Sequence, residues 1–122
     1  MMDSMELMKK AVQFADNKKA RDITVLSLGG LTTIADYFVI CSGGSSTQVK
    51  AIADEIEEKL SEQGIEPYGK EGFSNADWVL LDYSDVVVHI FTPDSREFFN
   101  IEKLWADAKR IETQDFLTIK QD

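Results

Sequence analysis

The spacing of apolar residues changes twice along the first half of the chain. Between residues 4 and 20 they recur every three or four positions with charged residues between them, which predicts an amphipathic helix. The short apolar runs ITVLSL (23–28) and YFVICS (37–42) are rich in β-branched and aromatic residues, as is typical of strands. The helical period then returns up to Leu60. Ser45 and Gln48 have the spacing of a capping box before it, and Gly64 is suited to ending this helix.

The second half of the chain predicts three strands and one further helix. Residues 65–72 predict an edge strand, because Pro67 lacks the backbone N–H that an inner strand would donate. WVLLD (78–82) and DVVVHIF (85–91) predict a hairpin. Pro93 suits the first position of a helix, whose apolar stripe consists of Phe98, Ile101, Leu104, Trp105 and Ala108.

These elements follow the order α-β-β-α-β-β-β-α. The order predicts an α/β fold, with one mixed sheet of about five strands covered by helices. The chain of 122 residues has the length of one domain, and we expect this domain to occupy residues 1–110. Residues 111–122 are mostly polar and predict a C-terminal tail.

Composition narrows the possible functions. Thirteen Lys and Arg residues oppose 22 Asp and Glu residues, for a formal net charge of −9. Nucleic-acid binding gains most of its affinity from basic side chains at phosphates, so we expect no sequence-specific nucleic-acid binding, and an acidic surface suits a basic protein partner instead. No apolar run approaches the ~20 residues of a membrane helix. Because the N-terminus carries acids early, it is unlike a secretory signal, and we expect a cytoplasmic protein.

The segment SGGSST (42–47) lies between a predicted strand and a predicted helix, where free N–H groups can bind phosphate. The Walker motif and the dinucleotide motif GxGxxG are both absent. The D-x-D metal site that accompanies such a turn in nucleotidyltransferases is absent too. A tight turn with a helix cap is the commoner role of such a segment, and nucleotide binding is the alternative.

Cys41 and His89 are the sole cysteine and the sole histidine of the chain. They would form a nucleophile–base pair if neighbouring strands brought them together. A cysteine in an apolar strand is far more often a small buried side chain. A single cysteine also excludes an internal disulfide and a cysteine-built metal site.

The hairpin decides whether Asp82, Asp85 and His89 can together bind a metal. A two-residue turn at 83–84 would place the two carboxylates opposite each other. Trp78 then pairs with His89, several residues away from both aspartates. We therefore expect no chelating cluster.

Strand alternation sorts the hairpin residues into two faces. The first face is wholly apolar and must lie in the core; it consists of Val79, Leu81, Val86, Val88 and Ile90. The second face is also apolar but includes amphipathic side chains; it consists of Trp78, Leu80, Val87, His89 and Phe91. An aromatic patch rimmed by acids is typical of a protein interface, but a helix could equally cover this face, and the pattern leaves both open.

Five blocks of the sequence follow one another in a distinctive order: DYFVICSGGSSTQVKAIADEI (36–56), EG (71–72), Trp78, LLDYSDVVVHIF (80–91) and REFFNIEKLW (96–105). Together they resemble the Iojap family, the bacterial ribosomal silencing factors RsfS, over roughly residues 4–108. The family's turn is often D-Y-G-D, and Ser84 in place of glycine suggests that this position does not strictly require a positive φ. The family's last helix usually reads Y-x-L-E-x-L-W, where this chain has Phe99 and Ile101.

The resemblance implies a mixed α/β fold distantly related to that of nucleotidyltransferases, without their catalytic carboxylates. It implies a protein that docks on the fourteenth protein of the large ribosomal subunit. Bound there, it would sterically block joining of the small subunit and lower translation, notably under nutrient shortage. A role in large-subunit assembly and a homodimer in the free state are also implied, and no catalytic residue, metal or cofactor is.

The resemblance also implies a docking surface at matching positions of this chain. Trp78 would be its aromatic anchor, with Leu80 beside it and His89 supporting it from the paired strand. The acidic tip of the hairpin would meet Arg and Lys of the ribosomal protein, and the preceding strand would supply the rim. The full expected set is Lys70, Glu71, Trp78, Leu80, Asp82, Tyr83, Asp85 and His89.

Two functions of other classes compete with this one. The first is a nucleotidyltransferase-like, nucleotide-binding protein that uses the segment SGGSST. The second is a general dimeric adaptor, which is all that composition by itself would support.

Overall fold

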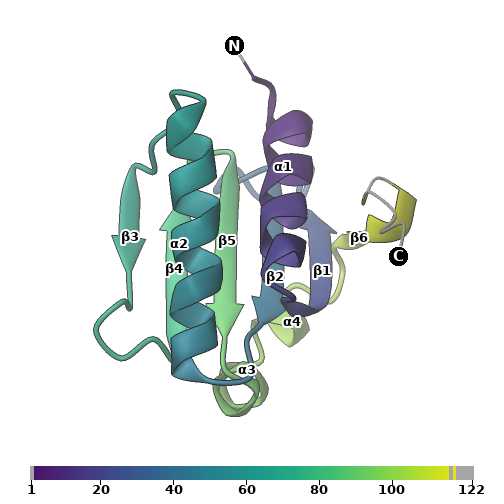
Figure 1. The fold of residues 1–122 in the computed structure, drawn as a ribbon. Helices are drawn as coiled ribbons and strands as arrows, with labels where there is room; N and C mark the ends of the chain where they lie inside the picture. Colours follow the sequence, from purple (N-terminus) through teal and green to yellow (C-terminus); the bar gives the residue numbers. More distant parts are fainter. Residues whose placement is uncertain (1, 116, 118–122) are drawn as a thin grey trace.

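A computed structural model describes residues 2–115 and 117, and Figure 1 shows its fold. The predicted order of elements is confirmed up to the last predicted helix, with boundaries that differ by a few residues. The elements are α1 (Ser4–Asn17), β1 (Arg21–Ser27), β2 (Tyr37–Ser42), α2 (Ser46–Glu62), β3 (Gly69–Glu71), β4 (Trp78–Asp82), β5 (Val86–Phe91), α3 (Pro93–Phe99), α4 (Ile101–Leu104), β6 (Lys109–Ile111) and the 3₁₀ helix η1 (Thr113–Asp115).

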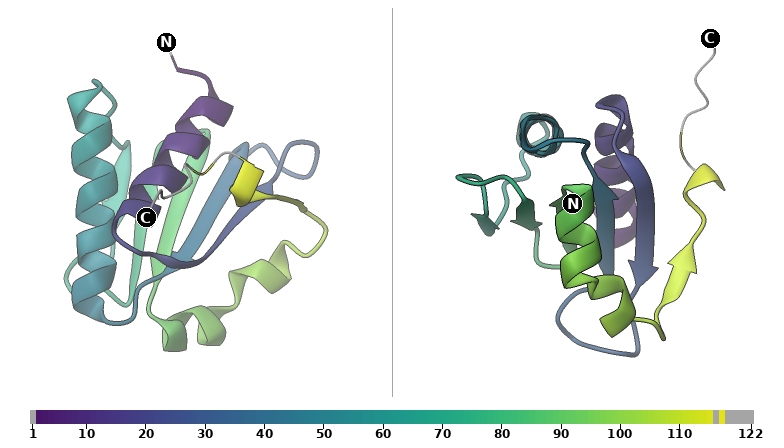
Figure 2. Two further views of the ribbon diagram at one scale, coloured as in Figure 1. Left: turned by 45° about the vertical axis from the view of Figure 1, so that its right-hand side comes forward. Right: turned by 90° about the horizontal axis from the view of Figure 1, so that it is seen from below.

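The strands form one mixed sheet in the order β3-β4-β5-β2-β1-β6. Strands β2 and β5 pair in parallel and the other neighbours are antiparallel. Helices α1 and α2 cover one face of this sheet, and the short helices α3 and α4 lie against the other (Figures 1 and 2). The predicted α/β class with a mixed sheet is therefore confirmed.

Each face of the sheet has its own apolar cluster. The cluster under α1 and α2 includes Val79, Leu81, Val86, Val88 and Ile90, the five hairpin residues predicted for the core, all fully buried. The cluster on the opposite face contains Leu26, Phe38, Ile40, Val87 and Phe91, with Trp78, Leu80 and Trp105 only partly buried at its margin. Full burial of a Leu or Ile side chain contributes about 1.5–3 kcal/mol, so the first cluster carries a large share of the stability.

The ends of α2 follow the predicted signals. The Ser45 hydroxyl accepts a hydrogen bond of 3.2 Å from the Gln48 N–H, as a helix cap does. The Gln48 side chain does not close a capping box on Ser45 and instead accepts from the Gly44 N–H at 2.6 Å. Gly64, just beyond the helix, has a φ of 82°, which glycine adopts without strain.

The prediction of one continuous last helix is wrong. The helix breaks at Asn100, which has left-handed backbone angles (φ 44°, ψ 54°), and α4 begins at the next residue. Asparagine adopts this conformation more readily than most residues. The break turns Phe98 and Leu104 away from the sheet, leaving them 81% and 77% exposed, so they do not belong to the predicted buried stripe.

The sheet has six strands where about five were expected. The sixth, β6, pairs with the free edge of β1, with Leu26 opposite Arg110. The segment KRI has three residues and one apolar side chain, which is too weak a pattern to predict a strand. Its extended conformation is fixed by hydrogen bonding to β1. Strand β6 crosses the boundary expected at residue 110, and residues 116 and 118–122 of the expected tail lie outside the described residues.

Candidate protein-docking site

The hairpin β4–β5 pairs in a register two residues away from the predicted one. Trp78 lies opposite Phe91, and Leu80 lies opposite His89. The predicted pairing of Trp78 with His89 is therefore wrong. An even shift keeps every side chain on its own face, because the strand repeat is two residues. The predicted division of the hairpin into two faces is confirmed.

The turn of this hairpin explains the shift. The Tyr83 N–H donates to the Val86 carbonyl at 2.9 Å, so the turn centres on Ser84 and Asp85 instead of residues 83 and 84. Ser84 has a φ of 71°, and its N–H donates to Asp82 Oδ1 at 2.7 Å. The expectation that the turn does not strictly require a positive φ at this position is wrong. Serine adopts this left-handed conformation at some energetic cost, and the hydrogen bond to Asp82 offsets part of that cost.

Trp78 is held by His89 across the hairpin. The indole Nε1–H donates to His89 Nδ1 at 3.1 Å, a contact between diagonal neighbours on the two strands. His89 is only 4% exposed, and burial lowers its pKa to about 4. The imidazole is therefore neutral near pH 7, with Nδ1 as acceptor and the proton on Nε2. His89 fixes the orientation of the indole ring and does not act as a charged group.

The Trp78 ring is the centre of an aromatic cluster. It stacks on Phe91 at a centroid distance of 5.0 Å and contacts Phe99 of α3 at 4.8 Å. Phe99 in turn contacts Phe98 edge to face at 5.0 Å. Phe98 and Phe99 are 81% and 46% exposed, so the cluster continues from the sheet onto open surface. These two residues were not predicted to belong to the site. On one continuous helix, Phe98 would be part of the buried apolar stripe and Phe99 would lie beside it.

The eight expected docking residues do not all share this surface. By strand alternation and pairing, five lie on the face with the aromatic cluster: Glu71, Trp78, Leu80, Asp82 and His89. Asp85 is exposed in the turn.

The other two expected residues, Lys70 and Tyr83, lie on the face under α1 and α2. Lys70 Nζ pairs with Glu57 of α2 at 2.9 Å, and Tyr83 is 4% exposed within the core cluster. Tyr83 is thus not part of an exposed acidic tip, because it continues the inward alternation of Val79 and Leu81.

The candidate nucleophile pair is separated by the sheet. Cys41 pairs with Ile90 and Ile40 pairs with His89 in parallel register, so the side chains of Cys41 and His89 project from opposite faces. Burial raises the pKa of the Cys41 thiol to about 12, which leaves it protonated and unreactive at neutral pH. The prediction that Cys41 is a small buried side chain is confirmed.

The glycines of SGGSST serve close packing. A Cβ on Gly43 would lie 2.8 Å from the backbone nitrogen of Val49, and one on Gly44 would lie 2.8 Å from the Arg21 guanidinium. The segment forms a tight turn and caps α2, as its structural interpretation predicts. The Val49 backbone explains the need for glycine at position 43, whereas the Arg21 side chain can move away from a Cβ at position 44.

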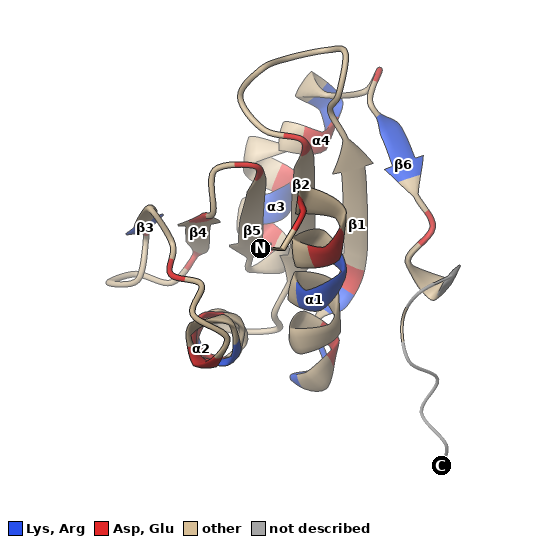
Figure 3. Cartoon of the chain, turned by 90° about the horizontal axis from the view of Figure 1, so that it is seen from above, with Lys and Arg blue, Asp and Glu red and all other residues tan. Residues whose placement is uncertain are grey.

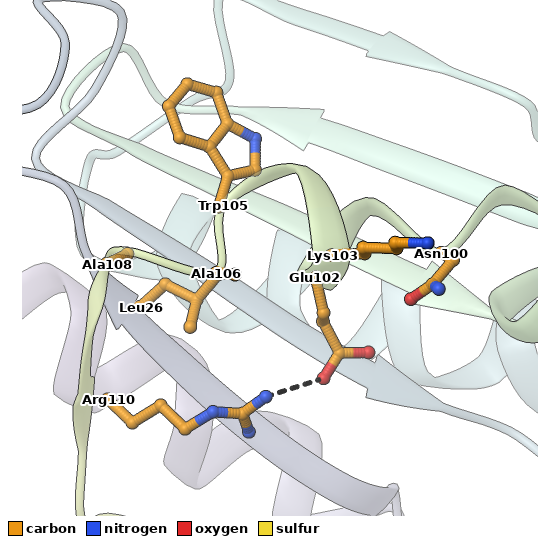
Figure 4. Close-up of a pocket in the computed structure, with 8 residues that line it drawn as sticks. All are labelled: Leu26, Asn100, Glu102, Lys103, Trp105, Ala106, Ala108 and Arg110. Atoms are coloured by element: carbon orange, nitrogen blue, oxygen red, sulfur yellow. Dashed lines mark ion pairs between the residues drawn. The ribbon is translucent and has the colours of Figure 1, made fainter.

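A hollow of about 400 Å³ lies beside the aromatic face, under α4 and next to β6 (Figure 4). Two of the charged residues that line it pair with each other, since Glu102 contacts Arg110 at 3.6 Å. Glu102 also accepts two hydrogen bonds from Arg96, which lower the pKa of its carboxyl group. Arg96 further donates to Ser42, so these groups join α3 and α4 to the sheet.

Within residues 2–115 and 117, no group of three or more His, Cys, Asp or Glu side chains is placed to hold a metal ion. None of the described helices has the length and apolar character needed to cross a membrane.

Known proteins resemble this chain closely in sequence and fold. Residues 1–122 match the family described as "RsfS: Ribosomal silencing factor during starvation". The ribosomal silencing factor RsfS of Halalkalibacterium halodurans is 45% identical over 117 residues, which cover 96% of this chain and 100% of that protein. A crystal structure of a protein from Chromobacterium violaceum has a TM-score of 0.84 and 37% identity, covering 86% of this chain and 88% of that chain.

A more distant relative has a name that refers to the large ribosomal subunit. The Mus musculus protein called mitochondrial assembly of ribosomal large subunit protein 1 is 34% identical over 97 residues. The match covers 77% of this chain and 42% of that protein.

Proposed function

Because the chain belongs to the RsfS family of ribosomal silencing factors, we propose that it binds the large ribosomal subunit and sterically blocks its joining with the small subunit. The partner on the large subunit is its fourteenth ribosomal protein, as the sequence resemblance implies. The protein acts in the cytoplasm, lowers translation during nutrient shortage, and catalyses no reaction. When free it forms a homodimer, and it also takes part in large-subunit assembly.

The partly buried aromatic face of the hairpin is the observation that supports this proposal. Trp78 and Leu80 are half-buried, and Trp78 contacts Phe99, which is 46% exposed. Large aromatic side chains at the centre of an interface contribute most of its binding energy. The hydrogen bond from Trp78 to His89 orders the indole before binding, which lowers the entropy lost when the partner docks.

Acidic side chains border the aromatic face. Glu71 and Asp82 project from the same side of the sheet as Trp78 and Leu80. They attract a basic ribosomal protein and disfavour acidic partners. Steric exclusion requires no more than this, because a bound protein that overlaps the space of the small subunit prevents joining without making or breaking a bond.

Sedimentation of the protein with purified ribosomal subunits in sucrose gradients tests the proposal. We expect the wild type to travel with large subunits and to inhibit joining when small subunits are added. Trp78→Ala should stay folded and weaken large-subunit binding by about 2 kcal/mol or more, roughly thirtyfold. Ile34→Ala is the control, since Ile34 is a large apolar residue that is 64% exposed in the β1–β2 connection and belongs to neither apolar cluster. A folded Trp78→Ala protein that binds like the wild type would show that Trp78 is not the anchor.

The nucleotide-binding alternative is tested with the same preparation. Incubation with Mg²⁺ and labelled nucleoside triphosphates should show neither saturable binding nor transfer, because the Gly44 N–H already donates to the Gln48 side chain and the turn lacks the carboxylates that would hold the metal. Tight binding abolished by Gly43→Ala would support the alternative instead.

A further inference from the structure

We propose that a cleft between α1, α2 and the β4–β5 turn binds an arginine side chain of a basic protein segment. The cleft has a volume of about 770 Å³ and lies at the end of the molecule where α1 begins and α2 ends. It is on the helix-covered side of the sheet, opposite Trp78, and the inference does not rest on the proposed function.

The lining of the cleft combines an apolar floor with an acidic rim. Leu7, Ile65 and Tyr83 supply apolar surface, and Glu6, Glu66 and Asp85 supply carboxylates. No lysine or arginine lines it among the described residues. Figure 3 looks down on this end of the molecule and shows acidic segments in α1, in the chain beyond α2 and in the β4–β5 turn.

Tyr83 provides a second observation, independent of the acidic rim. Its side chain lines the cleft and is 4% exposed, yet its hydroxyl has no hydrogen-bond partner among the described residues. Burial and the nearby carboxylates of Glu57 and Glu66 raise its pKa above the usual value, so the hydroxyl is uncharged and keeps both donor and acceptor capacity. A buried polar group without a partner costs stability unless a ligand satisfies it.

Arginine suits this combination of groups. Its aliphatic stem can cover the apolar floor while its planar guanidinium donates several hydrogen bonds to carboxylates and to a hydroxyl oxygen. A phosphate or nucleic-acid ligand is disfavoured, because three carboxylates and, among the described residues, no lysine or arginine line the cleft. A partner segment rich in arginine therefore fits best.

NMR titration of the full chain with the peptide acetyl-Gly-Arg-Gly-Arg-Gly-amide, at low salt, tests the inference. We expect saturable shift changes centred on Ile65, Glu66, Tyr83 and Ser84. The same peptide with citrulline in place of arginine keeps the shape without the charge and should bind at least about fivefold more weakly, because charge-assisted hydrogen bonds are roughly twice as strong as neutral ones.

Two variants locate the binding. Tyr83→Phe removes only the unpartnered hydroxyl, so it should fold at least as stably as the wild type and bind the arginine peptide about threefold more weakly or worse. Glu66→Gln should weaken binding similarly, whereas Glu112→Gln, which changes an exposed acid beyond the other edge of the sheet, should not.

Three results would overturn the inference: unchanged affinity of Tyr83→Phe, equal loss in Glu66→Gln and Glu112→Gln, or shifts of the same residues by calcium chloride that compete with the peptide. Equal loss would mean attraction to general negative charge, and competing calcium would mean a cation site. Trp78→Ala should bind the peptide like the wild type, which separates this inference from the ribosome-docking proposal.

Discussion

The two faces of the sheet are built from the same strands but differ in what covers them. Under α1 and α2, five hairpin residues are aliphatic and have no exposed surface at all. The opposite face carries aromatic side chains and a histidine among its aliphatic residues, and the short helices α3 and α4 leave Trp78 and Leu80 half-buried. One face thus supplies most of the buried core, and the other leaves apolar surface partly exposed.

The chemistry of the side chains reflects this division. Aliphatic residues pack densely and make no directional bonds, which suits a permanent core. Trp78 and His89 combine apolar rings with polar atoms, and they satisfy two of these atoms by bonding to each other. Such residues tolerate partial exposure to water and still bury a large area when a partner docks.

Truncation of adjacent leucines should separate the two faces most strongly. Leu81 is fully buried, so Leu81→Ala should lower the free energy of unfolding by about 3 kcal/mol. Leu80 is half-buried on the other face, and Leu80→Ala should cost about 1 kcal/mol or less while weakening large-subunit binding. Urea denaturation measures both. Equal losses would mean that the aromatic face is as much a part of the core as the other.

The attachment of α3 and α4 depends on Arg96. Its guanidinium bonds to Glu102, Ser42 and Thr24, and its side chain is 14% exposed. Arg96→Met should lower the free energy of unfolding by about 2 kcal/mol, because the Glu102 side chain, which is only 19% exposed, then loses its main partner. Arg110→Met is the control: Arg110 is 60% exposed and 3.6 Å from Glu102, so its loss should cost less than ~0.5 kcal/mol.

The aromatic face should also be the pH-sensitive one. The folded-state pKa of His89, about 4, lies below its unfolded value of about 6.5. Above pH 6.5 the imidazole is neutral in both the folded and the unfolded chain, and its contribution to stability does not change. Between pH 6.5 and about 4 the unfolded chain binds a proton that the folded chain does not bind, so stability is lost as the pH falls through this range. This should remove roughly 2 kcal/mol between pH 7 and pH 5.

His89→Leu isolates this effect, because carboxylates change the stability of both proteins in the same way. As the pH falls across that range, the unfolding free energy of the wild type should decrease by roughly 2 kcal/mol more than that of the variant. If wild type and variant lose the same free energy of unfolding, the imidazole is more exposed to solvent than it is in this structure.

The smallest expected effect concerns the turn that sets the register. Ser84→Gly relieves the positive φ of 71° and should raise the free energy of unfolding by about 0.5 kcal/mol. Asp85→Gly, at a neighbouring turn position without a positive φ, should lower it by a similar amount. A destabilised Ser84→Gly protein would indicate that the serine side chain itself supports the turn.

Much of the fold could be predicted because the patterns that specify it are local. The limits of β2, the cap at Ser45, the helix stop at Gly64 and the start of α3 at Pro93 all follow from short motifs or from the spacing of apolar residues. The break at Asn100 and the strand β6 could not be predicted in this way. Each depends on contacts with distant segments, through Arg96 in the first case and the edge of β1 in the second.

The candidate site was likewise predicted where it depends on local pattern and missed where it depends on tertiary packing. Alternation in the hairpin is a local property, and it placed Trp78, Leu80 and His89 together even though the predicted register was two residues off. The positions of Lys70 and Tyr83 were not anticipated, because the resemblance assigned them to the docking surface by their place in the sequence and not by the face that each strand position occupies. Phe99 was missed because its contact with Trp78 depends on where α3 packs.

From the amino-acid sequence alone came the succession of elements, the two faces of the hairpin and the resemblance to one family, since periodicity and motifs survive small errors in register. Tertiary structure alone decided which face stays open, which polar groups lack partners and where the chain departs from its local pattern. The physical reason is that coverage of a surface depends on residues far apart in the chain. The half-buried Trp78 and the buried hydroxyl of Tyr83 both result from such long-range packing.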